Sequence, residues 1–427
     1  MKVLNFIQEF MQQPSLFIGL IGLIGFILLR ERIERTISGT LKIIIGLLML
    51  TAGVNLMVPA ISPLGDLASK ALKLPPLNIQ IGTNKVIAGL GAAVGMVMLL
   101  SFLVNLLIAR FTRLKYIYLT GHLIFWNAVI YTTAFKYILK LDGVTLVLVS
   151  SLFTGLYQTL QPWATHKFDL YVNDNNNFVL GHDSSIVVIV TSLLSKLFSQ
   201  NGTKKARSME ELTFPKALSW LREPMLLMAS SFLILYIVVS LANYGAVSEM
   251  ASKAGHSPAI WILLQSFNFA VGFAVLMQGV RMFIAELIPA FKGIAEKVVP
   301  GALPAVDCPL FFPYGQVSMA YGGLIGMAAM VVTSLIFGGF KYPFFIFAPT
   351  MSAWFHGATG AVYGNKYWGI PGAILGGIVA GVLMGVGQAL MWPVLGFAIG
   401  DFFSWASDTD YVLIPLLIVV IGKIFVK

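Results

Sequence analysis

Long apolar stretches recur along this chain, and they restrict its possible folds more than any other feature. Val86–Ala109 and Met225–Asn243 hold no charged residue, and Leu41–Ala60 holds only Lys42. A transmembrane helix needs about 20 predominantly apolar residues, and each of these stretches has that length. Hydrophobic residues make up 58% of the chain and charged residues 11%. The sequence therefore predicts an all-α, polytopic membrane protein.

Several of the apolar segments are short or interrupted. Tyr116–Ile138 is broken at Gly121-His122, and Phe344–Tyr363 is broken around His356. Counting all segments gives about eleven transmembrane helices. Interrupted segments are typical of transporters, in which broken helices line a site near the middle of the membrane. We therefore expect re-entrant hairpins in addition to complete crossings.

Basic clusters indicate how the chain is oriented. Arg30–Arg35, Arg110–Lys115 and Lys204–Arg207 each follow an apolar segment. Lys and Arg are enriched in cytoplasmic loops, so these clusters place the N-terminus outside. Lys423 and Lys427 place the C-terminus in the cytoplasm, in agreement with an odd number of crossings.

The chain is expected to form a single membrane unit of two related halves. A polar loop over 201–220 separates a first half, 1–200, from a second half, 221–427. Lys115-Tyr116 and Lys341-Tyr342 each precede an interrupted apolar segment, one in each half. Such a pattern is typical of transporters built from structural repeats.

The stretch Gly279–Val298 is unusually rich in charge for this chain. On a helix, Arg281, Lys292 and Glu296 fall within about 60° of one another, and apolar side chains such as Phe283 fill the opposite arc. This split predicts an interfacial amphipathic helix that lies along the membrane surface.

Polar side chains in breaks of apolar sequence are the candidate site residues. Asp307 lies in a proline-broken apolar run, where a carboxylate indicates a functional site unless the run is a hydrated loop. His122 and His182 each follow a glycine, and His356 precedes one. An imidazole can donate to and accept from sugar hydroxyls, although it can also form a simple interhelical hydrogen bond. The repeated Gly-His pair favours a shared site.

Several classes of function are excluded by what the sequence lacks. No Walker loop, HExxH motif or GxSxG elbow is present, so we do not expect an enzyme. Cys308 is the single cysteine, which excludes a disulfide framework, and we expect no metal and no cofactor. No basic patch interleaved with aromatics indicates nucleic acid. No channel filter motif is visible, and polar groups in broken helices favour an alternating-access carrier.

The sequence resembles a known family in motifs that occur in order along essentially the whole chain, 1–427. They are Leu119-Thr-Gly-His122, Leu180-Gly-His182, Gln278–Leu287, Val299–Ala302, Ala305–Cys308 and Ala358-Thr359. These strings resemble the ascorbate-type enzyme IIC family of the ascorbate/galactitol superfamily, the membrane subunit of the bacterial sugar phosphotransferase system. The Gln278–Leu287 and Ala305–Cys308 strings are the most specific.

The resemblance implies an architecture and partners. It implies a homodimer in the bacterial cytoplasmic membrane, each protomer having a scaffold domain and a core domain with re-entrant hairpins. The core would carry a carbohydrate across by an elevator-like movement. A separate cytosolic enzyme IIB, bearing a phosphocysteine, would phosphorylate the substrate at the inner face. We expect no soluble IIA or IIB domain in this chain, so Cys308 would not be that cysteine.

The resemblance also implies a set of substrate-binding residues. They are Gly53, Val54, His122, Trp126, His182, Asp183 and Asp307. His122, His182 and Asp307 match the family in type. Trp126 and Asp183 replace glutamines of the ascorbate pattern, and Val54 replaces a small hydroxyl residue.

These departures leave the substrate open. Ascorbate is an anion, and an ionised Asp183 near Asp307 would repel it unless His122 and His182 compensate or one carboxyl is protonated. A neutral sugar or polyol, whose hydroxyls donate to carboxylates, would suit Asp183 better. A second alternative is a proton-coupled secondary transporter that uses these carboxyl and imidazole groups without partner proteins.

Overall fold

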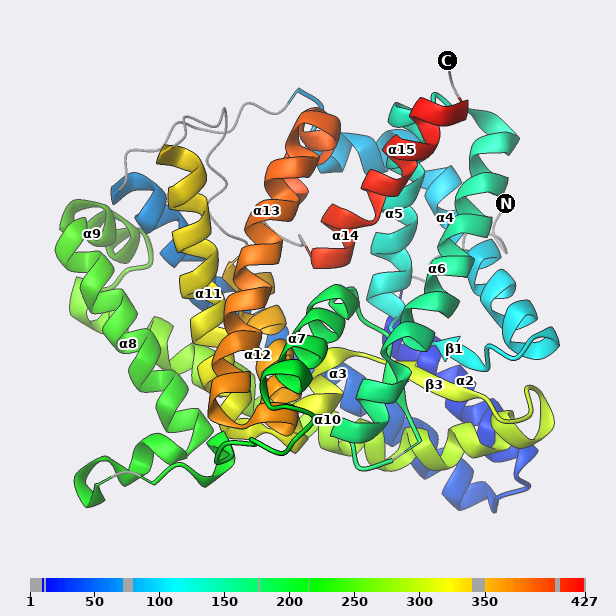
Figure 1. Ribbon diagram of the computed structural model, residues 1–427, viewed down its shortest axis with the longest axis horizontal. Coiled ribbons are helices and arrows are strands. Elements are labelled where there is room, and N and C mark those ends of the chain that lie inside the picture. Colours follow the sequence, from blue (N-terminus) through cyan, green and yellow to red (C-terminus); the bar gives the residue numbers. More distant parts are fainter. Residues whose placement is uncertain are drawn as a thin grey trace.

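The computed structural model describes residue 10 and residues 13–71, 80–175, 177–213, 215–339, 350–403 and 408–425. These residues are almost entirely helical, as the sequence predicts (Figure 1). Before the polar loop the helices are α2 (Pro14–Leu28), α3 (Ile33–Ala71), α4 (Thr83–Phe111), α5 (Gly121–Ile138), α6 (Gly143–Val172) and α7 (Ser185–Phe198). After it they are α8 (Pro224–Ala242), α9 (Tyr244–Lys253), α10 (Pro258–Lys297), α11 (Gln316–Gly339), α12 (Thr350–Trp368), α13 (Ile370–Phe403), α14 (Thr409–Leu413) and α15 (Pro415–Phe425). The short 3₁₀ helices η1 (Met209–Glu211), η2 (Lys216–Arg222) and η3 (Cys308–Tyr314) lie in connections.

Seven of the described helices are long and apolar enough to cross a membrane. They are α3, α4, α6, α8, α10, α11 and α13. Three shorter apolar helices are Ser15–Leu28, Ser185–Phe198 and Thr409–Gly422. The described residues therefore hold fewer full-length spans than the eleven or so crossings expected, because several apolar segments fold as short helices or strands.

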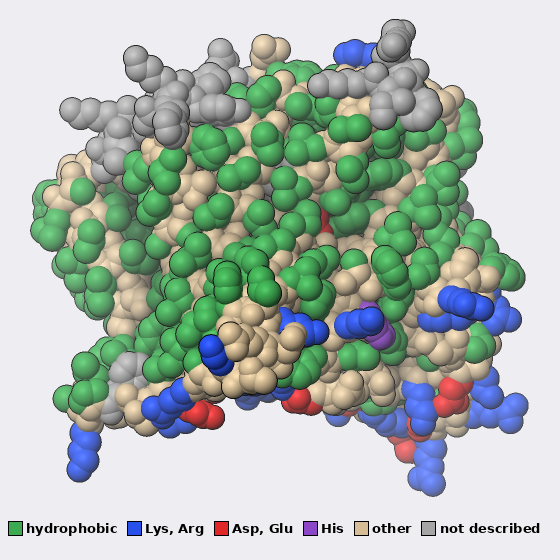
Figure 2. Space-filling model, in the orientation of Figure 1, with side chains coloured by type: hydrophobic (Ala, Val, Ile, Leu, Met, Phe, Trp, Pro, Cys, Tyr) green, Lys and Arg blue, Asp and Glu red, His purple; other side chains and the backbone are tan. Residues whose placement is uncertain are grey.

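The outer surface fits a lipid environment. Figure 2 shows hydrophobic side chains over the middle of one face, with Lys and Arg gathered along its lower edge. On α6, Leu148, Leu152 and Leu156 are 57%, 54% and 40% exposed and are spaced four residues apart, so they form one apolar stripe. The chain is thus a polytopic helical membrane protein.

The helices α3 and α10 cross at a close distance, and α2 packs against both. A Cβ atom at Gly53 would come within 2.5 Å of the Gly272 carbonyl oxygen, and one at Gly279 would come within 2.5 Å of the Leu50 nitrogen. Small residues let two membrane helices approach until their backbones touch. This contact fixes the rotation of α3 about its own axis, and so it sets the direction in which Leu50 and Val54 point.

Three short parallel strands lie inside the helical protein. They are β1 (Tyr116–Tyr118), β2 (Val179–Leu180) and β3 (Leu303–Val306), arranged in the order β1-β3-β2. In the register, Tyr118 and Val179 both pair with Ala305. Because the strands are parallel and in register, their carboxyl ends meet at one edge of the sheet. This small sheet was not predicted, since the strands are too short to show a period of two.

Side chains from neighbouring helices cover both edges of the sheet. On the β1 edge, the Asn105 amide donates to the Tyr116 carbonyl oxygen (3.1 Å) and accepts from the Tyr118 N–H (3.0 Å). On the β2 edge, the Asp169 carboxylate accepts from the Leu180 N–H at 2.9 Å. An unpaired backbone group in a membrane costs several kcal/mol, so these bonds let strands exist here.

The charged stretch that begins at Gly279 differs from its expected arrangement. The apolar arc is confirmed, because Phe283 is buried while Arg281 and Lys292 are exposed. However, the stretch is the last part of the 40-residue helix α10 and not a separate interfacial helix. Glu286 is buried and pairs with Arg35 and with Lys42 (3.2 Å) of α3, which joins this part of α10 to its neighbour.

Two further expectations need correction. α12 is continuous from Thr350 to Trp368, so His356 does not lie in a break, and Gly357 instead packs against Gly326 of α11. The C-terminus was expected on the same side as Lys204. In Figure 1, α15 ends at the upper edge, whereas the green segment between α7 and α8 runs along the lower edge. The last apolar helix, Thr409–Gly422, is shorter than the about 20 residues that a complete crossing needs.

The relation between the two halves stays a prediction. Lys341-Tyr342 and residues 344–349 of the expected broken segment lie outside the described residues.

Candidate functional site

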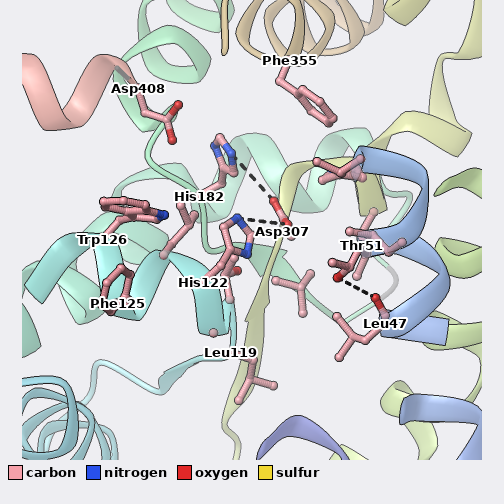
Figure 3. A pocket seen from close by; sticks show the side chains of 18 of the residues that line it. Leu47, Thr51, Leu119, His122, Phe125, Trp126, His182, Asp307, Phe355 and Asp408 are labelled. Carbon is pink, nitrogen blue, oxygen red and sulfur yellow. Dashed lines mark hydrogen bonds and ion pairs between the residues drawn. The ribbon is translucent and has the colours of Figure 1, made fainter. Parts of the chain in front are cut away.

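A cavity of about 710 Å³ lies where the carboxyl ends of the three strands face α3 (Figure 3). That volume is within the range of sites for small organic ligands. Its polar lining side chains are Gln13, Thr51, Thr120, His122, Trp126, His182, Asp307, Ser352, Asp408 and Tyr411. Most of the remaining wall is apolar, from residues such as Leu47, Leu50 and Phe283.

Asp307 is the central polar residue of the cavity. It directly follows β3, while His122 and His182 lie just beyond the ends of β1 and β2. The Nε2 atoms of His122 and His182 lie 3.8 Å from Oδ2 and Oδ1 of Asp307, respectively. Figure 3 shows both imidazoles pointing toward this carboxylate. The sheet thus brings together the three residues that sequence reasoning put in one site, although they are far apart in the chain.

Backbone bonds hold these three residues in place. The Leu119 N–H donates to the Ala305 carbonyl oxygen at 2.8 Å, and the Gly181 N–H donates to that of Val306 at 2.7 Å. The Thr120 hydroxyl donates to the Gly181 carbonyl oxygen. A Cβ at Gly181 would lie 2.7 Å from the Ala305 carbonyl carbon, so glycine is needed where β2 passes β3. The Cys308 N–H also donates to Asp307 Oδ1 at 2.7 Å.

Aromatic side chains form part of the wall. Trp126 and Phe125 follow His122 on α5 and contact each other edge to face, with ring centroids 5.0 Å apart. Phe355 of α12 lines the cavity from another side (Figure 3). Aromatic faces suit the C–H surfaces of a small ligand, while the polar groups hold its hydroxyls.

On the side of the cavity formed by α3, the Thr51 hydroxyl lies close to Val54, the residue predicted to bind substrate. Val54 lines the cavity, and Thr51 lines it one helical turn earlier. The Thr51 hydroxyl also donates to the Leu47 carbonyl oxygen at 3.0 Å. Sequence reasoning missed Thr51, although residues three apart on a helix share a face.

Asp183 and Gly53 do not line the cavity. Tyr157 of α6 donates to Oδ1 of the fully buried Asp183 at 2.5 Å, on the side where Asp410 also contacts Tyr157 (2.8 Å). Gly53 faces α10, as described above. The neighbours of these two residues in sequence, His182 and Val54, do line the cavity.

Asp408 is a second cavity carboxylate that sequence reasoning missed. It is buried at the start of the C-terminal segment, and its Oδ1 lies 3.7 Å from Nδ1 of His356. The signal was available, because Asp408-Thr409-Asp410 puts two carboxylates directly before an apolar run.

Two groups of side chains have the atoms to hold a metal ion. His182, His356 and Asp408 form one, and His182, Asp307 and Cys308 form the other, with ligand atoms within 4.8 Å of one another. In the first group, Nδ1 of His356 lies 2.9 Å from the Ser352 carbonyl oxygen and Nε2 lies 3.2 Å from the Thr409 N–H. A metal there would displace one of these bonds.

A polytopic helix bundle with a polar cavity at the ends of interrupted segments is typical of membrane carriers. The family model described as "PTS system sugar-specific permease component" (EIIC-GAT) matches residues 9–410, so the chain belongs to this family of phosphotransferase-system transport subunits. The chain is also similar to the "Ascorbate-specific PTS system EIIC component" of Mycoplasma pneumoniae (strain ATCC 29342 / M129 / Subtype 1), with 26% identity over 423 residues. The match covers 87% of this chain and 63% of that relative. The chain therefore spans less than two thirds of the relative's length. The family inferred from the sequence is confirmed.

Proposed function

We propose that this protein binds ascorbate or a related carbohydrate in the cavity around Asp307 and carries it across the bacterial cytoplasmic membrane. A separate cytosolic enzyme IIB would phosphorylate the substrate. The observation that carries the proposal is the convergence of His122, His182 and Asp307 at the ends of three strands in a sugar-permease family member. The curated relative, whose name specifies ascorbate, supports the substrate class.

The cavity residues have complementary tasks in this proposal. The Asp307 carboxylate accepts hydrogen bonds from substrate hydroxyls, and His122 and His182 donate or accept according to their protonation. Trp126 covers an apolar face of the substrate. Asp183 supports the position of His182 in this proposal, because it directly follows His182 and accepts a hydrogen bond from Tyr157.

The proposed transport movement follows from the two groups of elements that form the cavity walls. One wall belongs to α3 and to Phe283 of α10, and the opposite wall belongs to the strand ends. Sliding of the strand-bearing group past α3 and α10 would carry the substrate in an elevator-like way. The family resemblance supports a homodimer in which α3 and α10 belong to the stationary scaffold.

The first prediction tests transport directly. Vesicles containing the protein should produce phosphorylated substrate only when enzyme IIB and its phosphoryl donors are present inside. Asp307→Asn should weaken substrate binding, since an amide only partly replaces a carboxylate acceptor. Product formation by this variant should keep its dependence on enzyme IIB. Uptake of labelled substrates with and without the cascade measures both effects.

The same vesicles distinguish the rival mechanism. A proton-coupled transporter would accumulate unmodified substrate under an imposed pH gradient without any partner, and Asp307→Asn would abolish that accumulation. Such a result would contradict the phosphotransferase proposal. We expect no accumulation under these conditions.

A further inference from the structure

The helix α7 begins at Ser185, directly after the turn that follows His182. The first N–H groups of a helix have no partner inside the helix, and the side chain of the residue just before it usually accepts from one of them. Ser184 occupies that position, but its side chain forms no such bond. Its hydroxyl lies 3.0 Å from Nδ1 of His182 instead. The first turn of α7 therefore finds its acceptor elsewhere in the chain.

Asp410, 225 positions after Ser185, supplies that acceptor. Its Oδ1 accepts from the Ile186 N–H at 3.1 Å, and its Oδ2 accepts from the Ser185 N–H at 3.3 Å. The Ser185 hydroxyl also donates to Oδ2. Asp410 is fully buried, and a carboxylate is favoured at a helix N-terminus by these bonds and by the positive end of the helix dipole. Asp410 thus caps α7 from a distant part of the chain.

The C-terminal segment also holds the beginning of the same turn. The Asp410 N–H donates to the Asp183 carbonyl oxygen at 3.0 Å, and the Thr409 hydroxyl lies 3.3 Å from that oxygen. The Tyr157 hydroxyl of α6 lies 2.5 Å from Asp183 Oδ1 and 2.8 Å from Asp410 Oδ2. The turn that follows His182 is therefore bonded to the C-terminal segment at both of its ends.

The other face of this segment forms part of the cavity wall. Asp408 and Tyr411 line the cavity, whereas Asp410 contacts α7. Ligand atoms of Asp408 and His182 lie within 4.8 Å of each other, and Figure 3 shows these two side chains as neighbours in the wall. The segment 408–411 and the His182 turn thus form one bonded unit beside the cavity.

We propose that Asp410 is a positioning residue of the substrate site, which sets the place of His182 relative to Asp307 by capping α7. This proposal rests on the proposed carbohydrate site and gives Asp410 no contact with the substrate. Nε2 of His182 lies 3.8 Å from Asp307 Oδ1. The Gly181 N–H bond to β3 holds His182 on one side in sequence, and Asp410 holds it on the other. A binding side chain needs such support, because a displacement of about 1 Å weakens its contacts.

The first measurement tests the cap without any ligand. Hydrogen–deuterium exchange is followed on the full-length protein in lipid nanodiscs. Asp410→Ala should speed exchange of the Ser185 and Ile186 N–H groups by about 10- to 100-fold, because both lose their acceptor. Asp410→Asn should show a smaller change, since its amide oxygen can still accept one of the two bonds.

The second measurement asks whether the cap acts on binding through His182. Calorimetry on the parent with L-ascorbate and a series of hexoses and hexitols selects the tightest ligand. Asp410→Ala should weaken its binding by about 5- to 50-fold, and Asp410→Asn should weaken it less. In the His182→Ala background, Asp410→Ala should cause at most about a twofold further loss. Such non-additivity is expected when one residue acts through another, and it is not expected of a residue that only stabilises the fold.

Glu210 provides a matched control, because its carboxylate caps α11 in the same way. It accepts from the Val317 N–H at 2.9 Å, from the Ser318 N–H at 2.8 Å and from the Ser318 hydroxyl at 2.9 Å. None of these three residues lines the cavity. Glu210→Ala should therefore speed exchange at Val317 and Ser318 and leave ligand affinity within about twofold of the parent.

The outcomes separate the positioning role from the proposed function. Unchanged exchange at Ser185 and Ile186 in Asp410→Ala would overturn the cap. Faster exchange with unchanged affinity, or an equal loss with and without His182, would overturn the positioning role and leave carbohydrate binding intact. If Asp410→Ala does not fold, Asp410→Asn is judged by the same criteria. If no ligand binds the parent, the proposed function fails, and the role of Asp410 in substrate binding fails with it.

Discussion

At the scale of single residues, the candidate site is built on a carboxylate held between two imidazoles. Asp307 is mostly buried, and a buried carboxylate with no partner would be strongly destabilising. His122 and His182 provide that partnership without closing the carboxylate to a ligand, since both contacts are 3.8 Å long. A substrate hydroxyl can thus replace part of the contact.

The second prediction concerns these imidazoles. His122→Ala or His182→Ala should weaken substrate binding by about 5- to 150-fold, corresponding to roughly 1–3 kcal/mol of lost hydrogen bonding. Titration calorimetry on folded variants measures this change. His256→Ala, at an exposed position between α9 and α10, is the control and should bind as the parent does. Parent-like affinity in both cavity variants would contradict the site.

Asp183 gives the third prediction. Tyr157 has one phenolic proton and lies within hydrogen-bonding distance of both Asp183 and Asp410, so both contacts are hydrogen bonds only if one carboxyl is protonated. Asp183→Asn, which can still donate to the Tyr157 oxygen, should fold and leave the preference between neutral and anionic ligands unchanged. Asp183→Ala should lower the free energy of unfolding by about 1–3 kcal/mol. Thermal unfolding and competition binding test this, and an altered preference in Asp183→Asn would refute it.

At the scale of elements, the short sheet sets the geometry of the site. Its strands have no further strand partner among the described residues, so Asn105 and Asp169 complete their outer edges. Asn105 also donates to the Thr159 hydroxyl at 2.8 Å, which ties β1 to α4 and α6.

The fourth prediction follows from Asn105. Asn105→Leu should leave the Tyr118 N–H and the Tyr116 carbonyl unpaired and destabilise the protein by about 1–3 kcal/mol for each group. Substrate affinity should fall as well, since His122 lies four residues beyond β1. Asn84→Leu is the matched control, because Asn84 is an exposed residue of the same helix. Equal melting temperatures for the two variants would show that the β1 edge does not need Asn105.

Sequence reasoning predicted the residues that converge on the cavity only where the signal is local. A glycine followed by histidine in apolar sequence, or Asp307 among prolines, is visible without the fold. Contacts between distant segments are not, so Asp408 and the edge role of Asn105 were missed. Asp183 was assigned to the cavity with His182, because sequence alone does not show that consecutive side chains in a turn point apart. Likewise, Gly357 next to His356 predicts a break in an apolar segment. In the structure, Gly357 instead lets the continuous helix α12 pack closely against α11.

At the scale of the whole molecule, the distribution of charge suggests an orientation. Lys and Arg gather at one edge, which we assign to the cytoplasm (Figure 2). The C-terminal helix ends at the opposite edge, next to the α5–α6 connection, where Gly422 approaches Leu139.

The fifth prediction tests this orientation. Cys308 is fully buried, so a new surface cysteine can be labelled with little background. Thr203→Cys, in the exposed basic loop, should react with a membrane-impermeant maleimide only after the cytoplasmic face is opened. Asp142→Cys, in the α5–α6 connection, should react in intact cells. The reverse pattern would invert the proposed orientation.

The three-stranded sheet has a consequence for how such a carrier can change during evolution. Its hydrogen bonds are made by backbone atoms, so they do not depend on which ligand is carried. The residues proposed to contact the ligand, His122, His182 and Asp307, come shortly after the strands. A descendant could therefore acquire a new cargo by exchanging side chains at the strand ends. An insertion or deletion of one residue inside a strand would turn these side chains to the opposite face. Divergence in cargo should accordingly be found as substitutions at these ends, with the lengths of the three strands kept constant.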